Sequence, residues 1–135
     1  MENTMGIAEN KELVRGFFDD IAKGNIQGAL NRMAEDLRFT LIGTTKLSGV
    51  CNSRKEFVDR IMAPLGAQLE GALTITIDNL IADGDFVVVQ SHGRSATRRG
   101  IAYNNTYCQV FRINDGKIRE ATEYLDTELV TKAFG

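Results

Sequence analysis

The chain has 135 residues, 43% of them hydrophobic, and a formal net charge of -2. This length and composition suit one domain with a single hydrophobic core. Lys and Arg are scattered and give no basic surface, so nucleic acid is not an expected partner. No apolar run approaches the roughly 18 residues that cross a bilayer, and the first residues lack the pattern of a secretory leader, so we expect a soluble cytoplasmic protein that does not contact membranes.

The first third of the chain predicts helices. Leu13, Phe17 and Ile21 repeat every four residues and form one apolar stripe, and Gly24 offers a left-handed end to that helix. Asn25 can cap a second short helix that runs to about Met33. Residues 37–43 and 44–49 then favour a strand, a turn and a second short strand.

A third helix is predicted from a capping box, Ser53 to Glu56, in which each side chain can bond to the backbone of the other residue. Phe57, Ile61 and Leu65 supply its apolar face. Pro64 is expected to kink or end the helix, because proline lacks the N–H that a helix interior uses.

From residue 73 onward the hydrophobic period is two, which predicts strands over 73–82, 85–97, 102–113 and 117–126. Asp-Gly pairs at 83–84 and 115–116 are typical of tight hairpins. Three helices followed by an antiparallel meander predict one α+β domain over residues 1–135, with the helices on one face of the sheet. In residues 86–90, apolar side chains occur at the positions that point to either face of the strand. Both faces of the sheet are then expected to be covered, and we expect a homodimer to cover the outer face.

Four segments of the second half carry a family resemblance: DGDFVVVQ (83–90), YNNTYCQVF (103–111), INDGKI (113–118) and EATEYLDT (120–127). They resemble segments of SnoaL-like proteins in the nuclear transport factor two-like superfamily, which also holds ketosteroid isomerases and limonene epoxide hydrolases. The resemblance implies a cone-shaped α+β barrel with an apolar pocket, usually in a dimer. Its members include cyclases, isomerases, hydrolases and proteins that only bind or scaffold, so it does not fix an activity.

The catalytic positions of limonene epoxide hydrolases map poorly onto this sequence. The resemblance places their Arg and Asp of one strand at Gln90 and His92, their further Asp at Glu123, and their water-positioning Tyr and Asn at Phe39 and Leu41. Only one of these five keeps its charge type, so epoxide hydrolysis is the least favoured activity. The carboxylate base of ketosteroid isomerases also has no equivalent, because residues 38–49 contain no Asp or Glu.

His92, the one histidine of the sequence, and Glu123 remain as a candidate acid/base pair. Strand alternation puts Gln90, His92 and Arg94 on one face of their strand. A carboxylate in the apolar row of Glu123 would have its pKa raised by burial, or lowered by a charged histidine beside it. The alternative is that His92 is a hydrogen-bonded packing residue.

Other residues are candidates for ligand binding. Tyr107 or Gln90 could donate to a developing oxygen charge, and Phe39, Leu41 and Arg94 are expected to line the pocket. Asp126 either lies at the pocket mouth or caps a C-terminal segment over 127–134, and the cap is favoured. Which face of residues 103–109 points inward is not decided by alternation alone.

No metal or organic cofactor is expected, because Cys51 and Cys108 form no CxxC and have one histidine to join them. The hypothesis is a cofactor-independent isomerase or cyclase that acts on a small apolar carbonyl compound, with His92 as base or acid and Glu123 as its partner. The alternative is a non-catalytic module of the same fold that binds a small ligand or only dimerises.

Overall fold

The computed structural model describes residues 6–135 of the chain. The elements follow one another as α1 (Ile7–Ala22), α2 (Ile26–Asn31), β1 (Met33–Leu41), β2 (Gly49–Cys51), α3 (Arg54–Phe57), the π-helical segment η1 (Val58–Met62), α4 (Ala63–Gln68), β3 (Thr74–Asp83), β4 (Phe86–Arg94), β5 (Thr106–Asn114), β6 (Lys117–Leu125) and α5 (Thr127–Phe134). Helices thus come first and a run of strands second.

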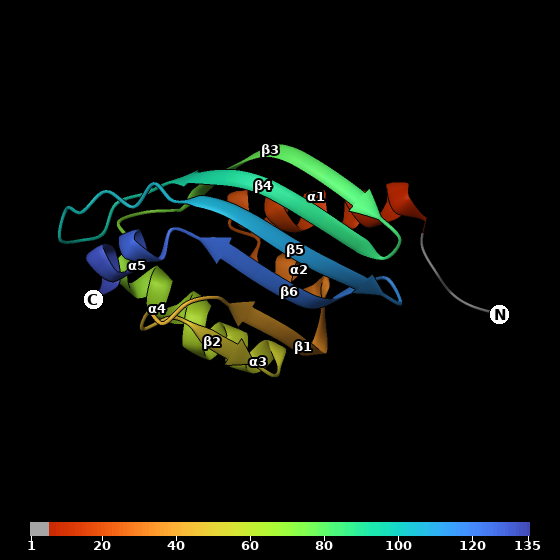
Figure 1. The fold of residues 1–135 in the computed structure, drawn as a ribbon, viewed down its shortest axis with the longest axis horizontal. Helices are drawn as coiled ribbons and strands as arrows, with labels where there is room; N and C mark the ends of the chain where they lie inside the picture. Colours follow the sequence, from red (N-terminus) through yellow and green to blue (C-terminus); the bar gives the residue numbers. More distant parts are fainter. Residues whose placement is uncertain (1–5) are drawn as a thin grey trace.

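The six strands form one curved sheet in the order β2-β1-β6-β5-β4-β3 (Figure 1). Strands β3 to β6 form an antiparallel meander, and the β1–β6 pair is the one parallel contact. The α+β class and the mostly antiparallel sheet are therefore confirmed. Asp115 and Gly116, both with positive φ, make the β5–β6 hairpin, where the sequence predicts it.

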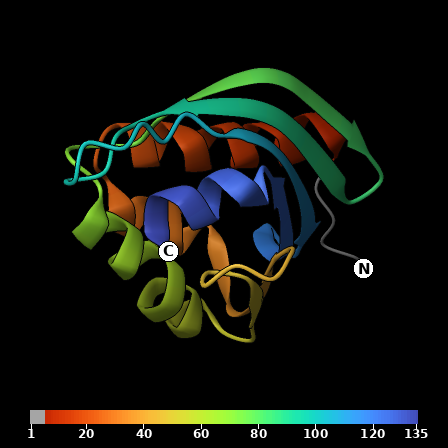
Figure 2. The same ribbon diagram turned by 60° about the vertical axis from the view of Figure 1, so that its left-hand side comes forward.

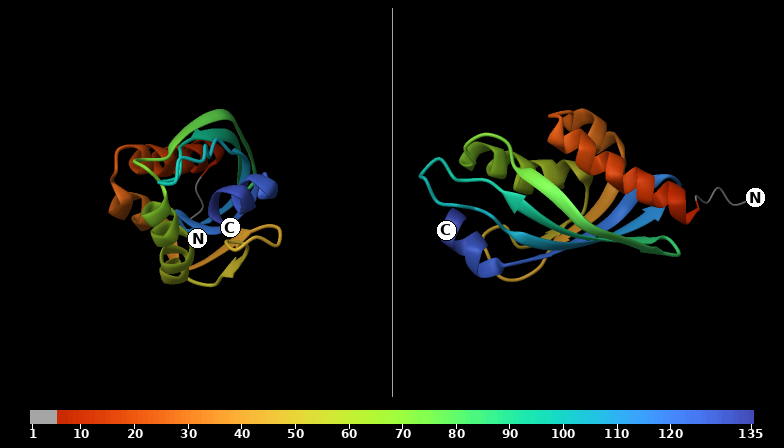
Figure 3. Two further views of the ribbon diagram at one scale, coloured as in Figure 1. Left: turned by 90° about the vertical axis from the view of Figure 1, so that its left-hand side faces the viewer. Right: turned by 90° about the horizontal axis from the view of Figure 1, so that it is seen from above.

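Helices α1 to α4 cover the concave face of the sheet, and the sheet curls around α1 (Figures 2 and 3). The predicted stripe of α1 packs against the core: Phe17 is 6% exposed, and Leu13 and Ile21 are partly buried. The adjacent Phe18 is 8% exposed. Both rings meet Phe111 of β5 edge-on, at centroid distances of 6.1 and 5.9 Å. Burying each such ring stabilises the fold by about 1.5–3 kcal/mol, so this cluster joins the first helix to the middle of the sheet.

The predicted turn and second short strand after residue 43 are both present, but the strand begins later than expected. The Ser48 hydroxyl donates to the carbonyl of Ile42 and accepts from the backbone N–H of Thr45, which closes a turn there. Strand β2 starts only at Gly49, whose φ of 134° a non-glycine residue rarely adopts. Local side-chain hydrogen bonds outweigh strand propensity in this segment.

The third helix neither ends nor breaks at Pro64. The Ser53 hydroxyl accepts from the Glu56 N–H at 3.0 Å, so the helix starts at the predicted cap. The π-helical segment Val58–Met62 then shifts the hydrogen-bond register, and Pro64 falls in the first turn of α4. Because that position needs no N–H donor, the helical path continues to Gln68.

The connection between β4 and β5 is irregular, although the sequence predicts strands up to 97 and from 102. Arg98 donates its backbone N–H to the carbonyl of Gln68 and its Nε to that of Ala67. Arg99 donates Nη2 to the carbonyl of Ala133 in α5. The connection is thus held between α4 and α5 at one end of the sheet (Figure 1).

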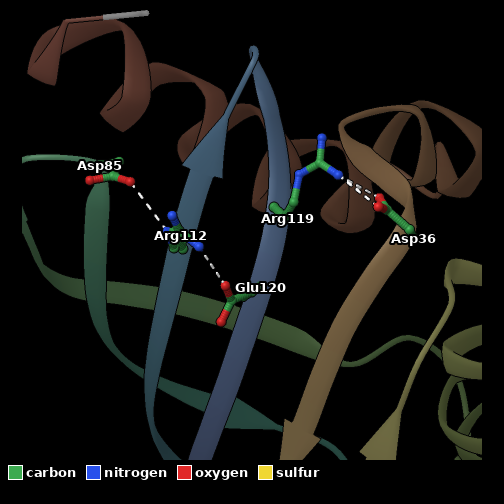
Figure 4. Close-up of polar contacts among 5 residues, drawn as sticks. All are labelled: Asp36, Asp85, Arg112, Arg119 and Glu120. Carbon is green, nitrogen blue, oxygen red and sulfur yellow. Dashed lines mark hydrogen bonds and ion pairs between the residues drawn. The ribbon is translucent and has the colours of Figure 1, made fainter.

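Ion pairs link neighbouring strands (Figure 4). Arg112 of β5 donates to Asp85 at 3.2 Å and to Glu120 of β6 at 2.7 Å. Arg119 donates to both oxygens of Asp36 in β1, at 2.7 and 2.8 Å. The side chains of Arg112, Glu120 and Arg119 are partly exposed to solvent, and we assign these ion pairs to strand pairing.

Within residues 6–135, no helix is long and apolar enough to cross a bilayer. Over the same range, no group of three or more His, Cys, Asp or Glu side chains is placed to hold a metal ion. Cys51 and Cys108 are both free thiols.

Candidate functional site

A cavity of about 330 Å³ lies between the sheet and the helices. Most of its wall is apolar and includes Phe17, Phe39, Leu41 and Ile61. Its polar groups come from β5, β6 and the connection before β5, namely Tyr103, Tyr107, Gln109 and Glu123, with Thr122 beside them. A concave apolar site with a few convergent polar groups is typical of small-ligand pockets, and this volume is at the lower end of their range.

The cavity opens between the α1–α2 turn and the connection from α4 to β3. The lining residues Gly24, Gly66, Gly71 and Ala72 are exposed at the surface, whereas Phe39 and Leu41 are buried. A side chain at Gly24, Gly66 or Gly71 would meet no atom within 4 Å. The rim is therefore built from small residues that leave the entrance open.

Strand register places the polar groups of β5 and β6 on the inner face. Gln109 of β5 lies opposite Glu123 on one side and Val89 of β4 on the other. Val89 is fully buried and Gln109 is 5% exposed. Because directly opposite residues share a face of the sheet, Glu123 points to the same interior as Val89 and Ser91.

The Glu123 carboxylate ends a short chain of hydrogen bonds. Ser91 donates Oγ to Oε1 of Gln109 at 2.9 Å, and Gln109 donates Nε2 to Oε1 of Glu123 at 3.3 Å. Burial in the apolar wall raises the pKa of Glu123 to about 7, against the lowering effect of the Gln109 hydrogen bond. Both protonation states are thus populated near neutral pH, as a residue that gives and takes protons requires.

Two buried tyrosines share this wall with Glu123. Tyr103 is 2% and Tyr107 is 5% exposed, and burial raises the pKa of both phenols. The nearby Glu123 charge adds to this in both cases. The two hydroxyls therefore stay protonated at neutral pH and can serve as hydrogen-bond donors in the cavity.

The structure does not bring His92 and Glu123 together, which corrects the expected acid/base pair. His92 lies opposite Thr106 on the outer face of the sheet, and its Nδ1 is 2.8 Å from a carboxylate oxygen of Asp78. Its side chain is 46% exposed. Within β4 and within β6, side chains alternate between the two faces of the sheet as predicted. The row that contains His92 and the row that contains Glu123, however, lie on opposite faces. The register between adjacent strands decides which rows share a face, and the sequence does not give that register.

Gln90 and Arg94 share the outer face with His92 and do not line the cavity. Gln90 accepts from the side-chain amide of Asn79 at 3.0 Å, and both it and Arg94 are exposed. Asp126 caps α5, accepting from the Leu129 N–H at 3.3 Å, which agrees with the favoured structural role rather than a place at the mouth. The inward positions of β4 are Val87, Val89, Ser91 and Gly93.

Phe39, Leu41 and Tyr107 do line the cavity, as does Glu123. Gln109 and Ser91 were absent from the predicted site. A signal for Gln109 exists, because it shares one strand parity with Tyr103, Asn105 and Tyr107. The sequence lacks the information on which parity faces inward, and the structure supplies it.

Residues 14–121 match the family model of the SnoaL-like domain, which is most of the chain. The chain belongs to the SnoaL-like domain family. An uncharacterized protein of Mycobacterium tuberculosis, Rv0034, is 25% identical to this SnoaL-like protein over 126 residues, which are 91% of this chain and 93% of that one.

Solved structures share the fold of this SnoaL-like protein. An NTF2-like protein of Burkholderia thailandensis has a TM-score of 0.83 at 23% identity and covers 93% of this chain and 97% of its own. A Jannaschia protein provisionally assigned as a SnoaL-like polyketide cyclase has a TM-score of 0.78 at 20% identity, and the match covers 98% of this chain and 96% of that one. An LEH-like epoxide hydrolase of M. tuberculosis has a TM-score of 0.76 at 16% identity, and the match covers 94% of this chain and 90% of that one. At these identities the likeness shows the fold alone.

Proposed function

We propose that this SnoaL-like protein is a cofactor-independent isomerase or cyclase that moves a proton on a small, uncharged, apolar carbonyl compound. The observation that carries the proposal is the Glu123 carboxyl, whose pKa burial raises to about 7 on the wall of an apolar cavity. Glu123 therefore takes the role of acid and base that the sequence assigned to His92. A fold shared with cyclases is consistent with this, as an analogy.

In the proposed reaction, the Glu123 carboxylate takes a proton from the carbon next to the carbonyl group. The C–H bond breaks, and its electron pair moves through the new C=C bond to the carbonyl oxygen, which becomes an enolate. Phenol donors on the same wall, Tyr103 and Tyr107, stabilise that charge. When the ketone carries a β,γ double bond, the protonated Glu123 returns the proton to the γ-carbon, and the double bond moves into conjugation with the carbonyl group, which isomerises the compound. Alternatively, the enolate carbon attacks a second carbonyl group, and Glu123 protonates the oxygen formed there, which closes a ring.

The charge of the cavity wall supports an uncharged substrate. Within residues 6–135 the lining contains no Lys, Arg or His, and its one ionisable carboxyl is Glu123. An anionic compound would meet no counter-charge and would be repelled by ionised Glu123. A neutral ketone loses little hydration on entry and gains apolar contact.

Deuterium exchange tests the proposal without knowledge of the natural substrate. The protein is incubated in D₂O with 2-tetralone, an apolar bicyclic ketone, and loss of its α-proton signals is followed by NMR. We expect exchange above the buffer rate, reduced in Glu123→Gln by the 10²–10⁴-fold typical of a lost general base. Exchange equal in the two proteins at every pH would contradict the proposal.

A second candidate is a binding module without catalysis, which the cavity alone would support. It predicts that ketones bind but exchange no faster than in buffer. An altered epoxide hydrolase is less favoured, because the water-positioning residues of such enzymes correspond to the apolar Phe39 and Leu41.

We also propose a homodimer through the outer face of the sheet. Ile81 is 55%, Phe86 46% and Tyr124 49% exposed. Ile81, Val88 and Val110 lie opposite one another in three adjacent strands and form an apolar row on that face. A second copy would remove this row from water, which favours association.

A further inference from the structure

Asn105, just before β5, makes four hydrogen bonds that together fix its side-chain amide. Its Oδ1 accepts from the backbone N–H groups of Thr106 at 2.8 Å and Asp126 at 3.0 Å. Its Nδ2 donates to the carbonyl of Asp126 at 3.2 Å and to the Tyr103 hydroxyl at 3.3 Å. Because an NH₂ group cannot accept from two N–H donors, the amide cannot be turned over, and a donor always faces Tyr103.

This arrangement constrains the proton of the Tyr103 hydroxyl. The Asn105 N–H occupies one acceptor position of the phenol oxygen, so Tyr103 cannot donate to Asn105. The Tyr103 proton therefore points away from Asn105 and is left for an acceptor in the cavity that Tyr103 lines.

We propose that Asn105 is a positioning residue that directs the Tyr103 hydroxyl proton into the cavity, where Tyr103 donates to a carbonyl or enolate oxygen of the bound compound. The inference rests on the proposed function, since it requires a carbonyl compound in the cavity. It distinguishes the two tyrosines, because Tyr103, which Asn105 contacts, is the donor to the ligand. A phenol oxygen that accepts hydrogen bonds becomes a stronger donor through its own O–H.

Asn105→Asp is a test of nearly equal size with reversed polarity. The aspartate can still accept from the two backbone N–H groups that hold Oδ1. Its other oxygen, however, presents an acceptor to Tyr103 where the wild type presents a donor. The Tyr103 proton would then be donated to the aspartate rather than to the ligand. Tyr103→Phe removes the hydroxyl and keeps the ring, so the proposal stays testable if the first variant does not fold.

The probe is 2-acetylnaphthalene labelled with ¹³C at its carbonyl, bound to the full chain, and the readout is the infrared carbonyl stretch. We expect the bound carbonyl to shift to lower wavenumber in the wild type and in Tyr107→Phe. The shift should be lost in Tyr103→Phe and in Asn105→Asp. Affinity should fall roughly two- to tenfold in Tyr103→Phe, the range for one neutral hydrogen bond.

Four outcomes would overturn the inference. A shift that survives in Tyr103→Phe but is lost in Tyr107→Phe would make Tyr107 the donor to the ligand. An unchanged shift in folded Asn105→Asp would remove Asn105 from the account. Failure of the ketone to perturb the NMR signals of cavity residues such as Phe39 would reject the proposed ligand class itself, and so would count against the proposed function as well. A bound, unshifted carbonyl rejects this inference alone.

Discussion

The side-chain amide of Gln109 donates to the carboxylate of Glu123 at 3.3 Å, across the β5–β6 pair and inside the cavity. Gln109 in turn accepts from the Ser91 hydroxyl at 2.9 Å. The one protein hydrogen bond that reaches this carboxylate within residues 6–135 thus comes from a side chain that is itself buried and held. Burial favours the protonated form of Glu123, and this contact favours the ionised form.

Gln109→Leu should raise the pKa of Glu123 further, by about one pH unit, because it removes a donor to the ionised form and keeps a side chain of similar size. The measurement is the carboxyl titration of Glu123 by ¹³C NMR. Ser91→Ala is the matched control, since it alters the same chain of hydrogen bonds one step away and should change the pKa less. A pKa that falls in Gln109→Leu would contradict the assigned hydrogen bond.

Glu123 should make the fold less stable as the pH rises. Its pKa lies near 7 in the folded protein against an ordinary value of 4.5, so between these values the folded state holds more protons than the unfolded state. The free energy of unfolding therefore falls as pH increases from about 4.5 through 7, by about 3 kcal/mol at most.

Glu123→Gln lacks this titration and retains the other ionisable groups. Urea denaturation at pH 5 and pH 8 should show the variant gaining stability relative to the wild type at the higher pH. A stability difference that is the same at both pH values would mean that the carboxyl is not desolvated in the fold.

His92→Ala should leave ketone exchange within about twofold of the wild-type rate, whereas Glu123→Gln should nearly abolish it. The reason is the placement of His92 beside Asp78 on the outer face, away from the cavity. The two variants are assayed side by side in D₂O with 2-tetralone. If the exchange rate fell as much in His92→Ala as in Glu123→Gln, His92 would take part in the reaction.

Gly66→Trp should slow ligand association by about tenfold or more, because a large side chain at the rim would cover the entrance. A Cβ at Gly66 meets no atom within 4 Å, and its φ is not in the left-handed region, so the substitution fits the backbone. Stopped-flow fluorescence with 2-acetylnaphthalene measures the rate, and Gly66→Ala is the control. Equal rates in the Trp and Ala variants would place the entrance elsewhere.

Val110→Glu should convert the proposed dimer to a monomer. Val110 lies in the middle of the outer face, opposite Val88 and Thr122, and a carboxylate buried there between two copies would be costly. Analytical ultracentrifugation at several concentrations gives the oligomeric state, with circular dichroism as a check on folding. A wild-type protein that sediments as a monomer throughout would reject the dimer.

Much of the fold could be predicted because local patterns and global architecture agree. The stripe of α1, the capping box at Ser53 and the Asp-Gly hairpin at Asp115 are each encoded within a few residues. The short strand after Thr45 starts later than predicted, because hydroxyl-to-backbone bonds extend the turn at the expense of strand pairing. The passage through Pro64 was missed because it depends on a π-helical turn that no sequence pattern announces.

The sequence predicted some of the cavity residues and missed others, and the reason differs from the one that applies to the fold. Alternation correctly grouped His92 with Gln90 and placed Tyr107 with Gln109, since it is a property of a single strand. Matching one strand's face to another's depends on register across the sheet, which long-range packing sets. Glu123 was therefore predicted correctly as a cavity residue, but His92 was wrongly predicted as its partner. The inward row of β4 contains Ser91, one residue before His92.

Titration of the Glu123 carboxyl is the most direct test of its proposed acid/base role. The protein is labelled with ¹³C at glutamate carboxyls, and the Glu123 resonance is identified by its absence from Glu123→Gln. Its chemical shift is followed from pH 3 to pH 9 without ligand. Burial in the cavity wall predicts a midpoint near 7. A midpoint near the ordinary glutamate value of 4.5 would show a solvated carboxylate and contradict the proposed acid/base role.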